Sequence, residues 1–259
     1  MRRFFNRFFS IAVVSAALTS VTPTSVSHAG TPASVQSNAR PYNLPVFGPV
    51  QIRSSDARSI DFRNNFLPTF RQIVNESLAE SVVFNNVSGF KLDAKRLFLR
   101  STSDLPIRVY FVHEGAGYWN SLGFSFTPAG QANPGTPFLI FPNASFSSPN
   151  STTRNQSNPL LVGDFVELTP GGPGIQMDFF LIADGARTPR NTWYNNTDLN
   201  VDGKQHVVAF LLPNSRYVMI GFEDLFGGGD LDYNDCVFVV DIGETNANNL
   251  FKDFSDLPN

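Results

Sequence analysis

The sequence is poor in cysteine, histidine and positive charge. Its one cysteine, Cys236, cannot form a disulfide within the chain, and the apolar run at residues 236–240 predicts a buried, inert thiol rather than a reactive one. Three histidines leave few candidates for catalysis that depends on imidazole. The 19 Lys and Arg stand against 22 Asp and Glu, so the chain lacks the excess positive charge that is typical of nucleic-acid-binding proteins.

The sequence also lacks a long apolar run. The most apolar stretch, residues 8–18, is shorter than the roughly 20 residues that a bilayer-spanning helix needs, so we expect no membrane span. It follows three arginines and precedes small residues around Ala29, which is typical of a secretory signal peptide. We therefore expect residues 1–29 to be cleaved near Ala29 and the protein to be secreted or extracellular, or to stay in a periplasm.

Removal of this signal peptide would leave an acidic protein. Residues 1–29 hold three arginines and no acid, so 19 less 3 leaves 16 Lys and Arg against 22 Asp and Glu, a net charge of −6. Such a protein attracts cations. Because it has no disulfide, bound metal is one way in which it could hold its loops in place.

Short apolar runs, rich in phenylalanine, alternate with glycine and proline along most of the chain. This pattern predicts an all-β fold, an antiparallel β-sandwich of the jelly-roll-like kind. The expected strands are residues 96–100, 107–113, 123–126, 138–141, 175–183, 205–212, 216–223 and 236–242.

One segment before these strands has helical spacing. Apolar residues recur at near-helical intervals over residues 68–80, with Pro68 at the start, where proline is tolerated. We expect residues 30–91 to be an N-terminal extension that contains this short helix and packs on the domain. The sandwich itself is expected over residues 92–242, followed by a polar C-terminal tail at residues 243–259.

Residues 221–235 concentrate oxygen-bearing side chains around three consecutive glycines. Calcium takes six to eight oxygen ligands, several of them carboxylates. Glycines 227–229 can adopt positive φ, which would let the two acidic ends of the segment fold onto each other. The segment therefore predicts a calcium site, and a solvated turn without metal is the alternative. The candidate ligands are Glu223, Asp224, Asp230, Asp232, Asn234 and Asp235.

A second acidic segment has the spacing of an incomplete calcium loop. Asp198, Asn200 and Asp202, followed by Gly203, match the first half of an EF-hand loop. Ala209 stands where the bidentate glutamate of an EF-hand belongs, so a complete EF-hand is excluded. A partial calcium loop and a plain turn both stay open. Pairing of residues 205–212 with 216–223 would bring this segment to the sheet edge that carries Glu223.

Three motifs give a family resemblance. Residues 109–123, 202–210 and above all 221–235, which read Gly-Phe-Glu-Asp-Leu-Phe-Gly-Gly-Gly-Asp-Leu-Asp-Tyr-Asn-Asp, resemble a bacterial domain of unknown function, number 4114. The resemblance covers about residues 97–241. It implies an exported, calcium-associated β-domain of the kind found beside adhesion modules, and it implies no known reaction. Phe226 stands where the family pattern has proline.

No catalytic signature is present in the sequence. There is no Gly-x-Ser-x-Gly elbow, no His-Glu-x-x-His helix and no phosphate-binding loop. His113 and His206 lie in or beside predicted strands, and we interpret both as structural. We therefore expect a protein that is not an enzyme. A glycoside hydrolase stays the less favoured alternative, with its two carboxylates drawn from Glu114, Glu167, Glu223 and Asp224.

A binding role has its own candidates. Tyr118, Trp119, Trp193 and Tyr194 lie beside asparagines in loop-like segments, and aromatic rings with amides suit a glycan or a surface protein. Packing of both tryptophans in the core is the alternative. A secreted structural protein whose metal only stabilises the fold is the second alternative.

Overall fold

The computed structural model describes residues 36–81, 91–92, 97–99, 105–128, 131, 133–168 and 174–255. The signal peptide predicted at residues 1–29 lies outside these ranges. So does part of the strand expected at residues 96–100. Within the described ranges, no helix combines the length and the apolar character that crossing a membrane requires.

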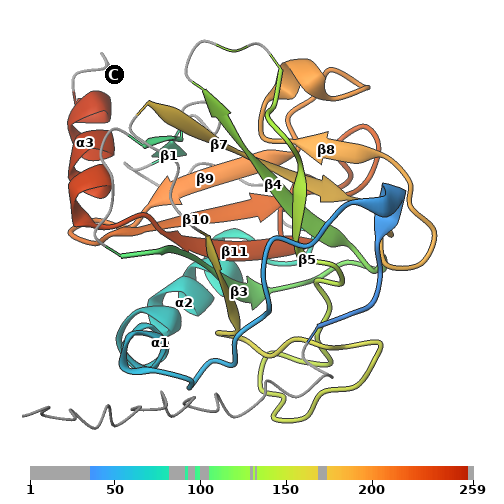
Figure 1. Ribbon diagram of the computed structural model, residues 1–259, viewed down its shortest axis with the longest axis horizontal. Coiled ribbons are helices and arrows are strands. Elements are labelled where there is room, and N and C mark those ends of the chain that lie inside the picture. The colour runs from blue at the N-terminus through green and yellow to red at the C-terminus, as the bar shows by residue number, and fades with distance from the viewer. Residues whose placement is uncertain are drawn as a thin grey trace, which may run out of the picture. The chain divides into compact units, whose positions relative to one another are not determined.

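In the described part of the chain the strands form two antiparallel sheets (Figure 1), and the expected β-sandwich is confirmed. The larger sheet has six strands in the order β1-β9-β10-β11-β3-β6. Their bounds are β1 Lys91–Leu92, β9 Val207–Leu211, β10 Tyr217–Phe222, β11 Cys236–Asp241, β3 Ile107–His113 and β6 Phe165–Leu168. The smaller sheet has the order β2-β7-β4-β5, and β8 also pairs with β7. Their bounds are β2 Phe98–Leu99, β7 Ile175–Ile182, β4 Ser121–Pro128, β5 Phe138–Phe141 and β8 Thr192–Tyr194.

Strands of the larger sheet are buried on both faces. Along β3, Phe111 packs against Phe141 of the smaller sheet, with ring centroids 6.1 Å apart. Its neighbour Tyr110 points to the opposite face, because successive side chains of a strand alternate. Both residues are fully buried. A strand that is covered on both sides reads as a continuous apolar run, which is what residues 109–112 are.

Three consecutive helical segments cover this second face. They are α1 (Ala57–Asp61), the π-helical turn η3 (Phe62–Phe66) and α2 (Leu67–Ser77). Figure 1 shows α2 lying along β3. Phe62 stacks on Tyr110 at 3.9 Å between ring centroids, and Phe66 packs on Tyr217 of β10 at 4.6 Å. The helical segments thus contribute to the same core as the sheets.

The short helix expected within residues 68–80 is confirmed, but the helical region begins earlier. Asp56 starts it, because its carboxylate accepts the Ser59 backbone N–H at 2.8 Å while the Ser59 hydroxyl accepts the Asp56 N–H at 3.3 Å. This reciprocal cap satisfies N–H groups that the first helical turn leaves free.

The polar tail expected after residue 242 contains a helix, α3 (Glu244–Ser255). It begins after Gly243, whose φ is +79°. Ala247 and Leu250 lie on its buried side. Leu250 reaches Leu99 and Ile242 at a small cavity between the sheets. Ala247, Leu250, Phe251 and Phe254 recur at helical spacing, so the sequence held a signal for this helix that the prediction of a polar tail overlooked.

Candidate metal centre

The acidic segment is the loop of a hairpin. Strand β10 ends at Phe222, strand β11 begins at Cys236, and these two residues are direct partners in the ladder. Since directly opposed residues of an antiparallel pair lie about 5 Å apart, Glu223 and Asp235, one position further on, must leave the sheet side by side. The register of the hairpin therefore brings carboxylates together that are twelve residues apart in sequence.

The backbone between them coils back on itself. Gly227, Gly228 and Gly229 have φ of +86°, +89° and +49°, as the sequence pattern predicted. Leu231 and Tyr233 also adopt positive φ, of 64° and 57°, which the sequence did not predict. Residues with positive φ thus alternate with Asp230, Asp232 and Asn234. This turns the backbone so that the polar side chains lie near one another instead of pointing to opposite faces, as they would in a strand.

Three carboxylates form a buried cluster. Glu223, Asp224 and Asp235 each offer an oxygen within 4.8 Å of the other two, and Glu223 and Asp224 are only 1% and 4% exposed. Glu223 Oε2 is buried and has no hydrogen-bond partner. Among the described residues, no lysine or arginine forms an ion pair with any of the three. The cluster is thus an anionic pocket that protein cations leave unneutralised.

The few polar contacts of this cluster hold it in shape. Asn120 Nδ2 donates to Asp224 Oδ2 at 2.7 Å, and the Asp224 backbone N–H donates to Asp235 Oδ2 at 2.8 Å. The side chain of Glu223 touches the backbone at Gly229, where an added Cβ would lie 2.0 Å from Glu223 Oε1. The triple glycine therefore does more than turn the chain, since its last residue leaves room for a carboxylate.

Burial shifts the protonation of these acids. It raises the pKa of Glu223 to about 7, with the charges of Asp230 and Asp232 adding to the effect. Burial, and then the charges of Asp224 and Glu223, raise the pKa of Asp235 further. Glu223, Asp224 and Asp235 therefore cannot all be ionised at the same time at neutral pH unless a cation lies beside them.

Glu114 borders the cluster and was not among the predicted metal ligands. Burial, with a contribution from the charge of Asp224, raises its pKa to about 8. It follows His113 at the end of β3, and His113 pairs with Val237 at the start of β11. Only the order of strands in the sheet could have predicted that Glu114 lies here, because the end of β3 and the start of β11 lie at the same edge of the sheet.

A second acidic group lies at the outer side of the loop. Glu80, Asp230 and Asp232 offer oxygens within 4.8 Å of one another, and the first two are exposed. Asp232 already accepts the backbone N–H groups of Ser81 at 2.9 Å and Asn234 at 3.1 Å. Glu80 comes from the chain just after α2, so no local sequence signal could have placed it here.

Asn234 ties the loop to the helices. Its Nδ2 donates to the Leu78 carbonyl at 3.1 Å and to Asp232 Oδ2 at 2.8 Å. Its backbone carbonyl accepts the Gly115 N–H at 3.1 Å. The structure therefore gives Asn234 a part in fixing the loop on α2 and on the end of β3.

The segment with EF-hand-like spacing lies beside the acidic loop. Asp202 Oδ2 accepts the Gly227 N–H at 2.8 Å, and Lys204 Nζ donates to the Gly227 carbonyl at 3.0 Å. This follows from the predicted pairing of β9 with β10, in which Val207 opposes Phe222. The structure does not bring the segment into the carboxylate cluster. Asn200 uses its amide on the backbone of Tyr194 and Lys204, and Asp198 is exposed.

Trp193 and His206 contact the backbone of Glu223 and Asp224. Both are fully buried, and their rings stack with centroids 3.7 Å apart. Trp193 Nε1 donates to the Asp224 carbonyl at 2.7 Å, and His206 Nδ1 lies 2.9 Å from the Glu223 carbonyl. His206 Nε2 lies 2.9 Å from Asp202 Oδ2, so the ring joins the acidic loop to the segment at residues 198–203. Trp193, a candidate for ligand binding, is thus placed in the core.

The other aromatic candidates lie nearer the surface. Tyr118, Trp119 and Tyr194 are half-buried. The Arg190 guanidinium lies over the Tyr118 ring at 4.8 Å and the Arg187 guanidinium over Trp119 at 4.5 Å. Arginine already covers a face of each of these two rings, and their role in ligand binding stays a prediction.

One of the three comparisons with known proteins gives a match. Residues 172–243 match the family model of the domain of unknown function DUF4114, which confirms the predicted resemblance over that region. The motif at residues 109–123 lies outside the matched region. The matched region runs through β7, β8, β9, β10 and β11 and includes both acidic segments. Searches of curated proteins and of solved structures found no match.

Proposed function

We propose that this domain binds a calcium ion through Glu223, Asp224 and Asp235 and acts outside the cell as a non-catalytic β-sandwich module for surface, matrix or ligand interaction. The observation that carries the calcium site is the buried Glu223 Oε2, which has no partner and lies among carboxylates. A buried carboxylate without a partner costs several kcal/mol unless a proton or a cation neutralises it.

The donor set favours calcium over a transition metal. All three ligand groups are carboxylates, and hard oxygen donors suit calcium or magnesium. Cys236 adjoins the cluster, but burial, and then the charges of Glu114, Asp235 and Asp224, raise the pKa of its thiol, so it is a poor metal ligand. The coiled, glycine-rich loop tolerates the irregular coordination of calcium better than the strict octahedron of magnesium.

The same geometry favours an ion site over a glycoside hydrolase. Hydrolases hold two carboxyl groups about 5–9.5 Å apart across a sugar. Here three carboxylates gather within 4.8 Å, and Glu223 and Asp224 are closed off from solvent. Such a cluster leaves no room for a sugar ring between the acids. Export and ligand interaction rest on the leader-like residues 1–29 and on the family resemblance.

Calcium titration calorimetry of the purified protein tests the site. At about 1 mM calcium and a Kd of about 10⁻⁴–10⁻³ M, binding should stabilise the fold by about 0.4–1.4 kcal/mol, which is a rise of roughly 1–5 °C in Tm. The double variant Glu223→Gln, Asp235→Asn should lose both the heat and the rise in Tm. Its amides keep the shape and remove the repulsion, so the metal-free variant should be at least as stable as the wild type.

The exposed Asp230 provides a matched comparison. Asp230→Asn removes one charge at the outer side of the loop, and it should weaken calcium binding while leaving the response in place. If the wild type gives no heat, or if the double variant responds to calcium as the wild type does, the proposed site is wrong.

Substitution of one glycine should abolish calcium binding without unfolding the loop. Gly229→Ala places a methyl group 2.0 Å from Glu223 Oε1, so the carboxylate must move. Gly227→Ala is the control. The φ of Gly227, +86°, strains an alanine more than the +49° of Gly229 does, but nothing lies within 4 Å of the Cβ added at Gly227. We expect Gly227→Ala to cost about 1 kcal/mol of stability and to keep the calcium response, and Gly229→Ala to lose the response. Equal calcium responses in the two variants would contradict the role given to Glu223.

A further inference from the structure

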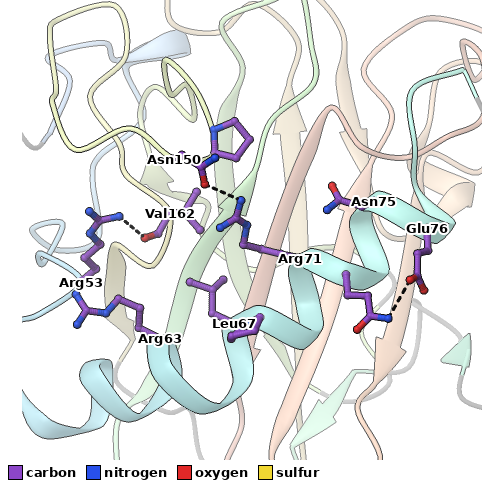
Figure 2. A pocket seen from close by; sticks show the side chains of 11 residues that line it. Arg53, Arg63, Leu67, Arg71, Asn75, Glu76, Asn150 and Val162 are labelled. Carbon is purple, nitrogen blue, oxygen red and sulfur yellow. Dashed lines mark hydrogen bonds between the residues drawn. The ribbon is translucent and has the colours of Figure 1, made fainter.

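A groove outside the metal centre carries an unusual concentration of arginine. It has a volume of about 630 Å³, within the range of ligand sites. Its walls come from η3 and α2, from the loop that follows β5, and from the segment before α1 (Figure 2). Arg53, Arg63 and Arg71 line it from two of these walls.

Within the described residues, none of the three guanidinium groups forms an ion pair with an acid. The nearest carboxylate is that of Asp164, whose Oδ1 accepts the Arg53 backbone N–H at 3.1 Å and whose charge acts on Arg53. Arg53 Nη1 donates to the Val162 carbonyl at 3.4 Å, and Arg71 Nη2 donates to Asn150 Oδ1 at 3.0 Å. Both acceptors are neutral. Arg63 makes no hydrogen bond or ion pair with the described residues. Figure 2 shows the Arg63 side chain pointing toward Arg53. Burial lowers the pKa of Arg53, the charge of Asp164 opposes this shift, and the charges of Arg63 and Arg154 add to it.

The acids nearest to the groove are already engaged. Both carboxylate oxygens of Asp164 accept from Arg154 Nη2, at 2.6 and 2.8 Å, and Oδ2 also accepts the Leu161 N–H at 2.7 Å. Glu76 accepts from Gln72 Nε2 at 2.9 Å. Three lining arginines less one lining glutamate leave a local charge of +2 on a chain whose net charge is −3.

The rest of the lining indicates the class of ligand. Leu67, Pro68 and Pro149 offer apolar surface, and the amides of Asn75 and Asn150 offer donors and acceptors. Arginine binds carboxylates in a two-pronged geometry, amides bind hydroxyls, and apolar side chains contact the C–H face of a ring. No aromatic side chain of the described residues lines the groove, so a sugar ring would contact Leu67, Pro68 and Pro149 instead of stacking on an aromatic ring.

We propose that this groove binds an acidic oligosaccharide, with the carboxylates of uronate sugars paired to Arg53, Arg63 and Arg71. No groove residue belongs to the metal centre, so this inference is independent of the calcium site.

Hexagalacturonate is a suitable probe, titrated calorimetrically into the purified protein. The titration is run in EGTA, because polyuronates themselves bind calcium, and is repeated with the double variant Glu223→Gln, Asp235→Asn. The methyl-esterified hexamer, which has the same sugars without charge, is the matched ligand, and hexaglutamate is the peptide comparison. Arg63→Gln and Arg71→Gln are the groove variants. Arg40→Gln, at an exposed arginine outside the groove, is the control.

We expect hexagalacturonate to bind, with about tenfold loss of affinity in each groove variant, none in Arg40→Gln, and weaker binding as salt rises. The esterified hexamer should not bind measurably. Unchanged Tm values of the variants would show that the loss is not unfolding. Equal binding of the esterified hexamer, unchanged affinity in the groove variants, or preference for hexaglutamate would each overturn the proposal. Binding in EGTA without any calcium response would keep this proposal and reject the calcium site.

Discussion

Replacement of Trp193 by alanine is expected to lower the free energy of unfolding by about 3–5 kcal/mol. The indole is fully buried, stacks on His206, and donates to the Asp224 carbonyl. Alanine would leave a cavity next to the loop, and the Asp224 backbone carbonyl would lose its hydrogen-bond donor. Urea denaturation followed by circular dichroism measures the loss, and calorimetry with calcium should show weaker binding in the same variant.

Two comparisons separate packing from hydrogen bonding at this position. Trp193→Phe keeps most of the ring but leaves the Asp224 carbonyl without its donor, and should cost about 1–3 kcal/mol beyond the lost volume. Trp119→Ala, at a half-buried ring under Arg187, should cost about 1 kcal/mol. If Trp193→Ala costs no more than Trp119→Ala, the central role of the Trp193–His206 stack is disproved.

Without calcium, the folded protein should lose stability as the pH rises from about 5 to 7. Burial, aided by neighbouring carboxylates, raises the pKa of Glu223 to about 7 and that of Asp235 further. In the unfolded chain such groups titrate near pH 4. Between these values the folded state holds more protons than the unfolded state, so the free energy of unfolding falls by up to about 1.4 kcal/mol per pH unit for each group.

Calcium should reverse this trend. The ion replaces protons on the carboxylates, so its stabilising effect should grow with pH over the same interval. Urea titrations at pH 5, 6 and 7, with EGTA or with calcium, measure both slopes. In EGTA the variant Glu223→Gln, Asp235→Asn should lose most of the wild-type slope. Glu114, whose pKa burial raises to about 8, still lowers the stability as the pH rises, while His113, whose pKa burial lowers to about 4, opposes it. A steep slope that survives in this variant would assign the pH dependence to other groups.

The sequence predicted the parts of the fold that depend on local pattern. Apolar runs predicted most of the strands but not β1, β6 and β8, which are short. The glycines at 227–229 predicted the positive φ, and the spacing of acids predicted the loop. The helical region from Ala57 was underestimated although Phe62, Phe66 and Phe70 recur at helical spacing, because the prediction began at Pro68. Helix α3 was missed because its asparagines favoured a polar tail, although its four apolar residues also have helical spacing.

The sequence predicted only those residues of the candidate site that lie within the segment 221–235. Glu114 and Glu80 join the acidic groups from β3 and from the end of α2, more than a hundred residues away in sequence. Only the order of strands in the sheet could have brought Glu114 to this edge. Asp202 was expected near the loop and lies there. Its Oδ2 accepts the Gly227 N–H and lies 2.9 Å from His206 Nε2, so this oxygen is engaged outside the carboxylate cluster.

The order of β9, β10 and β11 in the chain bears on how the protein folds. These strands follow one another and pair as neighbours, so their contacts are local and cost little loop-closure entropy. Strand β3, which must join β11 from far along the chain, has the higher contact order. We therefore expect the meander to form early, with its crowded negative charge in place before most of the core can compensate for the repulsion. Proton and calcium concentrations should then affect the folding rate as well as the final stability.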